Sequence, residues 1–108
     1  MTHLCDAVQR AEQGLIGADL GGGLLKQRLA RDGEGKSGGF RTLIFFSLGD
    51  RAVFAFGFAK SDRANLNADE TRMFKKAAKV VLALSQAEID FEIRAGRLTE
   101  VQCDDQNL

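Results

Sequence analysis

Two β-rich runs joined by a short polar turn constrain the fold of this chain more than any other feature. Residues 40–48 and 51–60 are rich in Phe and also contain the β-branched residues Thr42, Ile44 and Val53, and Gly49-Asp50 separates them. Aromatic and β-branched residues favour strands, and a short glycine-containing connection between two such runs predicts an antiparallel hairpin. Six of the eight phenylalanines lie in these runs. The sequence therefore predicts a protein built around an antiparallel sheet.

The second arm of this hairpin carries apolar residues on both faces. Strict alternation places Phe54, Phe56 and Phe58 on one face. The other face then holds small and β-branched residues (Val53, Ala55, Gly57 and Ala59). A strand that is apolar on both sides is typical of the covered centre of a sheet, so we expect this arm to be a central strand.

Three amphipathic or capped segments predict helices. An apolar stripe near the N-terminus predicts a helix that ends at Gly14 and Gly17 (Leu4, Val8, Ala11 and Leu15). Asn67 and Glu70 have the spacing of a capping box and open a second helix with its own apolar stripe (Phe74, Ala77, Val81 and Leu84). A second capping pair, Ser85 and Glu88, predicts a third helix over residues 85–95.

A further strand is expected over residues 24–31, directly after a triple glycine. Alternation sends Leu25 and Leu29 to one face and Lys26 and Arg28 to the other, which gives this strand a basic face. Residues 98–101 are expected as a short edge strand, and residues 103–108 as a loose tail. At 108 residues the chain is predicted to form a single α+β domain, residues 1–108, in which helices pack on a small antiparallel β-sheet.

The formal net charge of zero conceals a basic middle between acidic flanks. Residues 26–79 hold twelve Lys or Arg and six Asp or Glu, whereas residues 1–25 and 80–108 are both net acidic. A basic segment of this kind favours a surface that binds a polyanion such as nucleic acid. The alternative is an ordinary solvated surface, and both interpretations also apply to the basic side of the second helix (Arg72, Lys75, Lys76 and Lys79).

Several other classes of protein are disfavoured. No set of His, Cys or carboxylate residues has metal-ligand spacing, so neither a metal nor a small-molecule cofactor is expected. No apolar run approaches the ~18 residues of a membrane helix and no signal-peptide pattern occurs, so the expected location is the cytoplasm. In that compartment Cys5 and Cys103 are expected to be two unpaired thiols.

The glycine-rich segment before the hairpin has the letters of a phosphate loop but not its context. Gly33, Gly35 and Gly38 have G-x-G-x-x-G spacing, and residues 35–37 match the end of a Walker A loop. Both motifs act through the N-terminus of a following helix, whereas a strand follows here. The segment is expected instead to place Lys36 and Arg41 beside the sheet.

Three blocks of the sequence together resemble the RelE family of bacterial toxins. These blocks are residues 20–28, 35–41 and 57–66, which combine glycines, basic residues and a Phe-Ala-Lys strand end. The resemblance implies a RelE-like (microbial-ribonuclease-like) toxin fold with a basic cleft that cuts messenger RNA, in many members only on the ribosome. It also implies a cognate antitoxin that binds and silences the toxin.

RNA cleavage without a metal requires a base near the 2′-hydroxyl, cations around the phosphate and an acid at the leaving oxygen. Because the chain has no Tyr and only one His, near the N-terminus, lysine is the leading candidate for proton transfer. The resemblance implies that Arg41 stabilises the transition state and that Lys60 and Lys36 transfer protons or contact phosphate. Six further basic residues are assigned to RNA binding (Lys26, Arg28, Arg31, Arg63, Lys75 and Lys79).

The chain departs from better-known family members at two places. Those members have an arginine after the lysine that Lys60 matches and a tyrosine a few residues later, where this chain has Ser61 and Asn67. Phe40 or Phe58 could stack on a base instead, although the apolar alternation around both favours core packing. Two functions therefore stay open: a ribosome-dependent messenger-RNA endonuclease, or a non-enzymatic protein on the same fold, such as a ParE-like gyrase inhibitor or a silent RNA binder.

Overall fold

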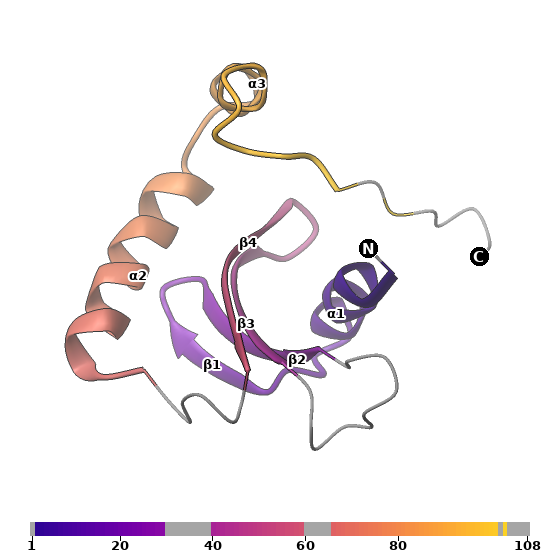
Figure 1. The fold of residues 1–108 in the computed structure, drawn as a ribbon, viewed down its shortest axis with the longest axis vertical. Helices are drawn as coiled ribbons and strands as arrows, with labels where there is room; N and C mark the ends of the chain where they lie inside the picture. The colour runs from indigo at the N-terminus through magenta and orange to yellow at the C-terminus, as the bar shows by residue number, and fades with distance from the viewer. Residues whose placement is uncertain (1, 30–39, 60–65, 102, 104–108) are drawn as a thin grey trace.

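The computed structural model describes residues 2–29, 40–59, 66–101 and 103. Within these ranges the elements follow one another as α1 (Thr2–Glu12), β1 (Ala18–Gly21), β2 (Leu24–Leu29), β3 (Phe40–Ser47), β4 (Arg51–Ala59), α2 (Ala68–Leu82) and α3 (Gln86–Arg94). Helices pack on a four-stranded antiparallel sheet, which confirms the expected α+β fold (Figure 1).

The strands lie side by side in the order β1-β2-β3-β4. The predicted hairpin is confirmed as β3 and β4, where Ser47 pairs with Arg51 and Gly49 takes a φ of 74° in the turn. The expectation that β4 is a central strand is wrong, because β4 is at the edge of the sheet in the described part of the chain. Residues 98–101, expected as an edge strand, form no strand there.

The first strand of the sheet was not expected from the sequence. β1 pairs with β2 across a turn in which Gly22 and Gly23 take φ values of 65° and 87°. These values lie in the left-handed region that favours glycine. The triple glycine therefore connects two strands, and the expected strand over residues 24–31 is described as Leu24–Leu29.

The helices α1 and α2 cover opposite faces of the sheet. Ala7 and Ala11 of α1 form one buried cluster with Leu25 and Ile44. Ala78 of α2 belongs to a second buried cluster, with neighbouring residues of the same strands (Leu24, Leu43 and Phe45). Successive strand residues point to opposite faces, so neighbouring residues of each strand belong to different clusters. Leu25 and Ile44 face α1, whereas Leu24, Leu43 and Phe45 face α2. The sheet thus forms the middle of three layers (Figure 1).

A β-bulge in β4 changes which of its side chains share a face. Leu43 pairs with Phe56 and Ile44 pairs with Phe54, so Ala55 is the extra residue. Phe54 packs against the α1 cluster, whereas the Phe56 ring has its centroid 5.9 Å from that of Phe74 in α2. The expected face shared by Phe54 and Phe56 is therefore wrong, because the bulge reverses the alternation between them.

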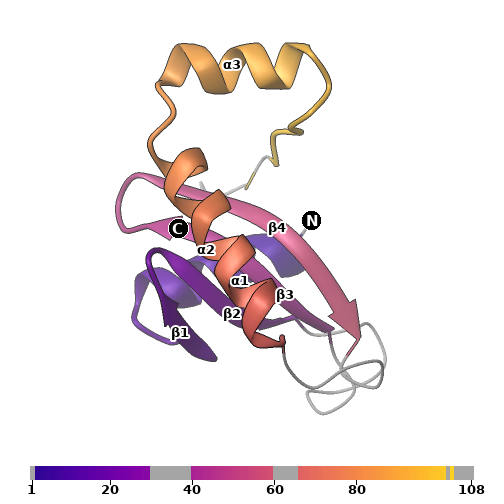
Figure 2. The same cartoon turned by 90° about the vertical axis from the view of Figure 1, so that its left-hand side faces the viewer.

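The second and third helices begin as predicted. In α2 the Asn67 side chain accepts from the Glu70 amide and the Glu70 carboxylate accepts from the Asn67 amide. Ser85 and Glu88 make the same reciprocal pair at α3. Figure 2 shows α2 lying across the strands and α3 beyond the end of the hairpin.

Arg51, at the start of β4, joins the end of α2 to the sheet. Its Nη1 donates to the Val81 carbonyl at 2.9 Å and to the Leu84 carbonyl at 2.8 Å. The last carbonyls of a helix have no partner within the helix, and a cation there also complements the helix dipole. Arg51 therefore fixes the position at which α2 ends.

The first helix is confirmed, with a shifted apolar side. Ala7 and Ala11 are its buried residues, while Leu15 lies beyond the helix and is exposed. The segment after the helix is fixed by Gln27, a buried side chain of β2. Its amide nitrogen donates to the carbonyls of Ala7 and Leu15, and its oxygen accepts from the Gly17 amide, each at 3.0 Å.

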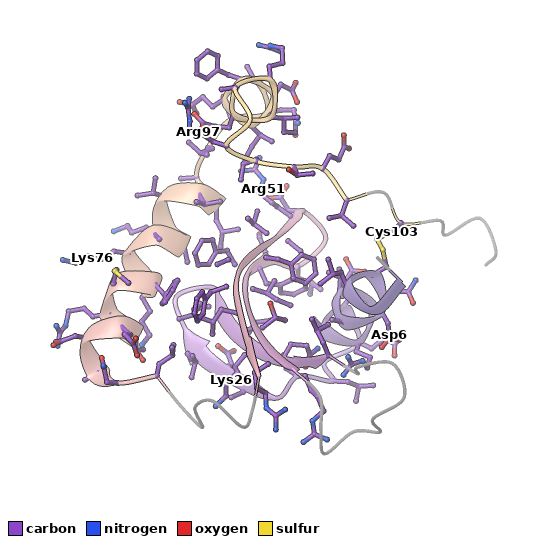
Figure 3. All side chains as sticks on the ribbon, in the orientation of Figure 1. Asp6, Lys26, Arg51, Lys76, Arg97 and Cys103 are labelled. Carbon is purple, nitrogen blue, oxygen red and sulfur yellow. A yellow bond between two sulfur atoms is a disulfide. The ribbon has the colours of Figure 1, made fainter. Side chains whose placement is uncertain are left out.

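The expectation of two unpaired thiols is wrong. Cys5 and Cys103 form a disulfide between α1 and the C-terminal segment, across 98 residues of sequence (Figure 3). The fold brings Cys103 beside α1, which a wide spacing in the sequence cannot show.

Candidate RNA-binding site

The register of β2 against β3 gathers three basic residues on one face of the sheet. Arg28 pairs directly with Arg41, and Lys26 pairs with Leu43 in the adjacent row. Leu43 packs in the α2 cluster, and alternation places Lys26, Arg28 and Arg41 on that same face. We call Lys26, Arg28 and Arg41 the basic cluster; Figure 3 shows Lys26 at the lower end of the sheet.

The pairing of two arginines is unfavourable unless an anion lies between them. Side chains at directly opposite positions have Cβ atoms about 4.5–5.5 Å apart, and like charges there repel each other. Arg28 is exposed and Arg41 is half-buried, so a ligand from solvent can reach the pair. Guanidinium groups bind phosphate oxygens through two parallel N–H bonds, and a phosphate would convert the repulsion into attraction.

Arg41 has a hydrogen-bond donor that is unused in the described part of the structure. Its Nη1 is buried and has no hydrogen-bond partner among the described residues. A buried donor without a partner costs about 1–3 kcal/mol, more for a charged group. An acceptor supplied by a ligand would remove this cost, so Arg41 is the residue of the basic cluster best prepared to bind an oxyanion.

The basic residues of α2 lie apart from this cluster. Lys75 and Lys79 are exposed, and a Cβ added to Gly21 would lie 3.5 Å from the Lys75 ammonium nitrogen. Gly21 adjoins the row of Leu24 and Phe45, four residues and about 13 Å along β3 from Arg41. Of the described RNA-binding candidates, Lys75 therefore lies near Gly21, apart from the basic cluster, and Lys79 follows it about one turn further along α2.

Four of the predicted site residues lie outside the described residues: Arg31, Lys36, Lys60 and Arg63. The described strands show only where the chain leaves and enters the sheet. β4 ends at Ala59, which pairs with Phe40 at the start of β3. That end of the hairpin is beside the row of Arg28 and Arg41.

Arg10 supports the basic cluster, and sequence reasoning did not single it out. Its Nη2 donates to the Arg28 carbonyl at 2.7 Å, and its Nε pairs with Asp6 at 2.9 Å. These groups line a cavity of about 540 Å³ between α1, the segment after it and β2. An arginine four residues after an aspartate on a helix was the only local signal for this contact.

The described residues contain no group of three or more His, Cys, Asp or Glu placed to hold a metal ion. In the same ranges no helix has the length and apolar character needed to cross a membrane.

Comparison with known proteins identifies a family. Residues 1–101 match the family described as the RelE toxin of the RelE / RelB toxin-antitoxin system. No individual curated protein matches the sequence. The match includes the basic cluster, α1 and all four strands.

Proposed function

The chain belongs to the RelE family, the toxins of RelE/RelB toxin–antitoxin systems, and on this basis we propose that it is a messenger-RNA endonuclease that inhibits translation. Family membership implies an antitoxin partner. The proposal adds the reaction, its metal independence, and its dependence on the ribosome. The observation that carries it is the pair of Arg28 and Arg41, with an unused buried donor on Arg41.

The proposed reaction is attack of a ribose 2′-oxygen on the adjacent phosphorus, with loss of the 5′-oxygen of the next nucleotide. Arg41 donates to the non-bridging oxygens, where negative charge grows in the transition state. Arg28 and Lys26 hold the flanking backbone as cations. Lys60 follows β4 directly in the sequence and is assigned, with Lys36, to proton transfer or phosphate contact.

Primer extension on messenger RNA from cells that express the chain tests this proposal. We expect discrete cuts in phase with codons for the wild-type chain, and a reduction of about 100-fold or more for Arg41→Ala. Arg72→Ala is the matched control, because Arg72 is an exposed arginine paired with Asp69 on the outside of α2. DNA damage without such cuts would instead indicate a gyrase inhibitor.

A second assay tests the metal independence of the cut. Purified chain and ribosomes are mixed with messenger RNA, and EDTA is added with ribosome integrity monitored separately. Cleavage should persist, since lysine and arginine side chains supply all the positive charges that stabilise the phosphate in the proposed step. Loss of cleavage that a divalent ion restores, with the ribosomes intact throughout, would contradict the mechanism.

A further inference from the structure

An exposed aromatic ring lies on the sheet beside the basic cluster. Phe56 is 42% exposed, although it is a large apolar side chain within β4. The bulge at Ala55 turns it to the α2 face, which also carries Lys26, Arg28 and Arg41. Without this bulge, alternation would place Phe56 on the α1 face with Phe54. The irregularity in β4 therefore brings an aromatic side chain onto the basic face.

The strand register places this ring close to the basic cluster. Phe56 pairs with Leu43, and Leu43 pairs with Lys26, so the three residues form one row across the sheet. Arg41 lies two residues from Leu43, diagonal to Phe56. Diagonal neighbours are about 7–8 Å apart, within reach of aromatic and long side chains. A ligand held by Arg41 can therefore also contact the Phe56 ring.

The ring is supported from α2. Its centroid is 5.9 Å from that of Phe74 and the two planes are inclined by 33°, which is a tilted aromatic contact. Phe74 itself packs against the buried α2 cluster. The support limits the freedom of the Phe56 ring, so less conformational entropy is lost when a planar group stacks on its exposed part.

We propose that Phe56 stacks on a base of single-stranded RNA whose phosphates are held by Arg41, Arg28 and Lys26. This inference rests on the proposed RNA-directed function and adds a base-binding residue to it. A nucleotide joins an apolar aromatic face to an anionic phosphate, and a supported phenyl ring beside cations matches both parts. The side chains of the predicted stacking candidates, Phe40 and Phe58, lie outside the described side chains, so their role stays a prediction.

The absence of Tyr and Trp from the chain provides a direct test. Phe56→Trp introduces a single tryptophan, whose fluorescence decreases when a base stacks on it. The probe is a single-stranded RNA that is 2′-O-methylated throughout and so cannot be cut through its 2′-oxygen. Phe91→Trp is the matched control, because Phe91 is 54% exposed but lies in α3 under the Arg97 guanidinium. We expect saturable quenching only for Phe56→Trp, and its loss when Arg41→Ala is added.

Binding measurements separate this inference from the proposed function. Phe56→Leu keeps an apolar contact with Phe74 but has no aromatic face, and should bind the RNA about tenfold more weakly, whereas Phe56→Tyr should bind like wild type. Arg41-dependent RNA binding with an unquenched Phe56→Trp and an unaffected Phe56→Leu would overturn the stacking role alone. If the wild-type chain does not bind the probe, the stacking role is also wrong, and primer extension then decides the proposed function independently.

Discussion

Replacing Gln27 with methionine should destabilise the fold by removing a buried polar contact between the sheet and the segment after α1. Gln27 is 1% exposed and makes three hydrogen bonds of 3.0 Å with the backbone of α1 and of the segment after it. Methionine has a similar length and can fill the space, but it forms none of these bonds. The substitution therefore isolates the polar contribution of this side chain.

The expected magnitude follows from the hydrogen bonds that the substitution removes. The Leu15 carbonyl and the Gly17 amide each lose the hydrogen bond that Gln27 provides. The Ala7 carbonyl also loses its bond to Gln27 and keeps only the hydrogen bond that it accepts within the helix. Leu15 and Gly17 are exposed, so water can replace the bonds at these two groups, and the loss follows from the three hydrogen bonds themselves. At a net of about 0.5–1.5 kcal/mol for each bond, the loss is about 2–4 kcal/mol. The total stability of a domain of this size is about 5–15 kcal/mol, so the loss is a large fraction of it.

Urea unfolding followed by circular dichroism measures this loss, because the chain has no tryptophan or tyrosine to report by fluorescence. Thr42→Val is the matched control. Thr42 is also buried in the sheet, but its hydroxyl makes one good hydrogen bond, to the Phe56 carbonyl at 3.2 Å. We expect about 1 kcal/mol for Thr42→Val. Equal losses for both variants, or a loss below about 1 kcal/mol for Gln27→Met, would refute the argument.

Three further substitutions test contacts elsewhere in the fold. Arg51→Met removes two bonds to the end of α2 and should cost about 2–4 kcal/mol in urea unfolding, with partial recovery in Arg51→Lys. Gly23→Ala should destabilise more than Gly22→Ala, because both have positive φ but only the added Cβ at Gly23 meets a leucine of α2, at 2.6 Å. The hydrogen bond from Arg97 lowers the pKa of Glu92, so carboxyl NMR should show the Glu92 titration moving to higher pH in Arg97→Ala. In the wild-type chain, the stabilisation from this contact should be fully present above the ordinary glutamate pKa. It should be lost as the pH falls through the lowered pKa of Glu92.

The elements with local signals could be predicted from the sequence. The hairpin and the capped starts of α2 and α3 depend on residues within a few positions of one another, and the structure confirms them. The four residues of β1 carry no such signal. They form a strand because β2 pairs with them and because Gln27, ten residues after Gly17, fixes the segment that leads into them. Local propensity cannot report a contact of that kind.

The candidate site depended even more on contacts between distant residues. The resemblance pointed to Arg28 and Arg41 separately, but their direct pairing follows from the register of two strands joined by residues outside the described ranges. The face on which Phe56 lies depends on a bulge, and alternation in the sequence gave the wrong face. The bulge accompanies the packing of Ala55 and Phe56 toward α2, an element that follows β4 in the chain.

The disulfide between Cys5 and Cys103 closes almost the whole chain into a covalent ring. In the chain-entropy account, a closed loop of about 100 residues restricts the unfolded chain by about 4.7 kcal/mol. The ring also changes what a single backbone cut does. A protease that cleaves the exposed turn at Leu48 opens the ring but leaves one covalent molecule, because the two pieces stay joined through sulfur. The nicked protein would therefore run as one species on a denaturing gel without reductant and as two fragments with it.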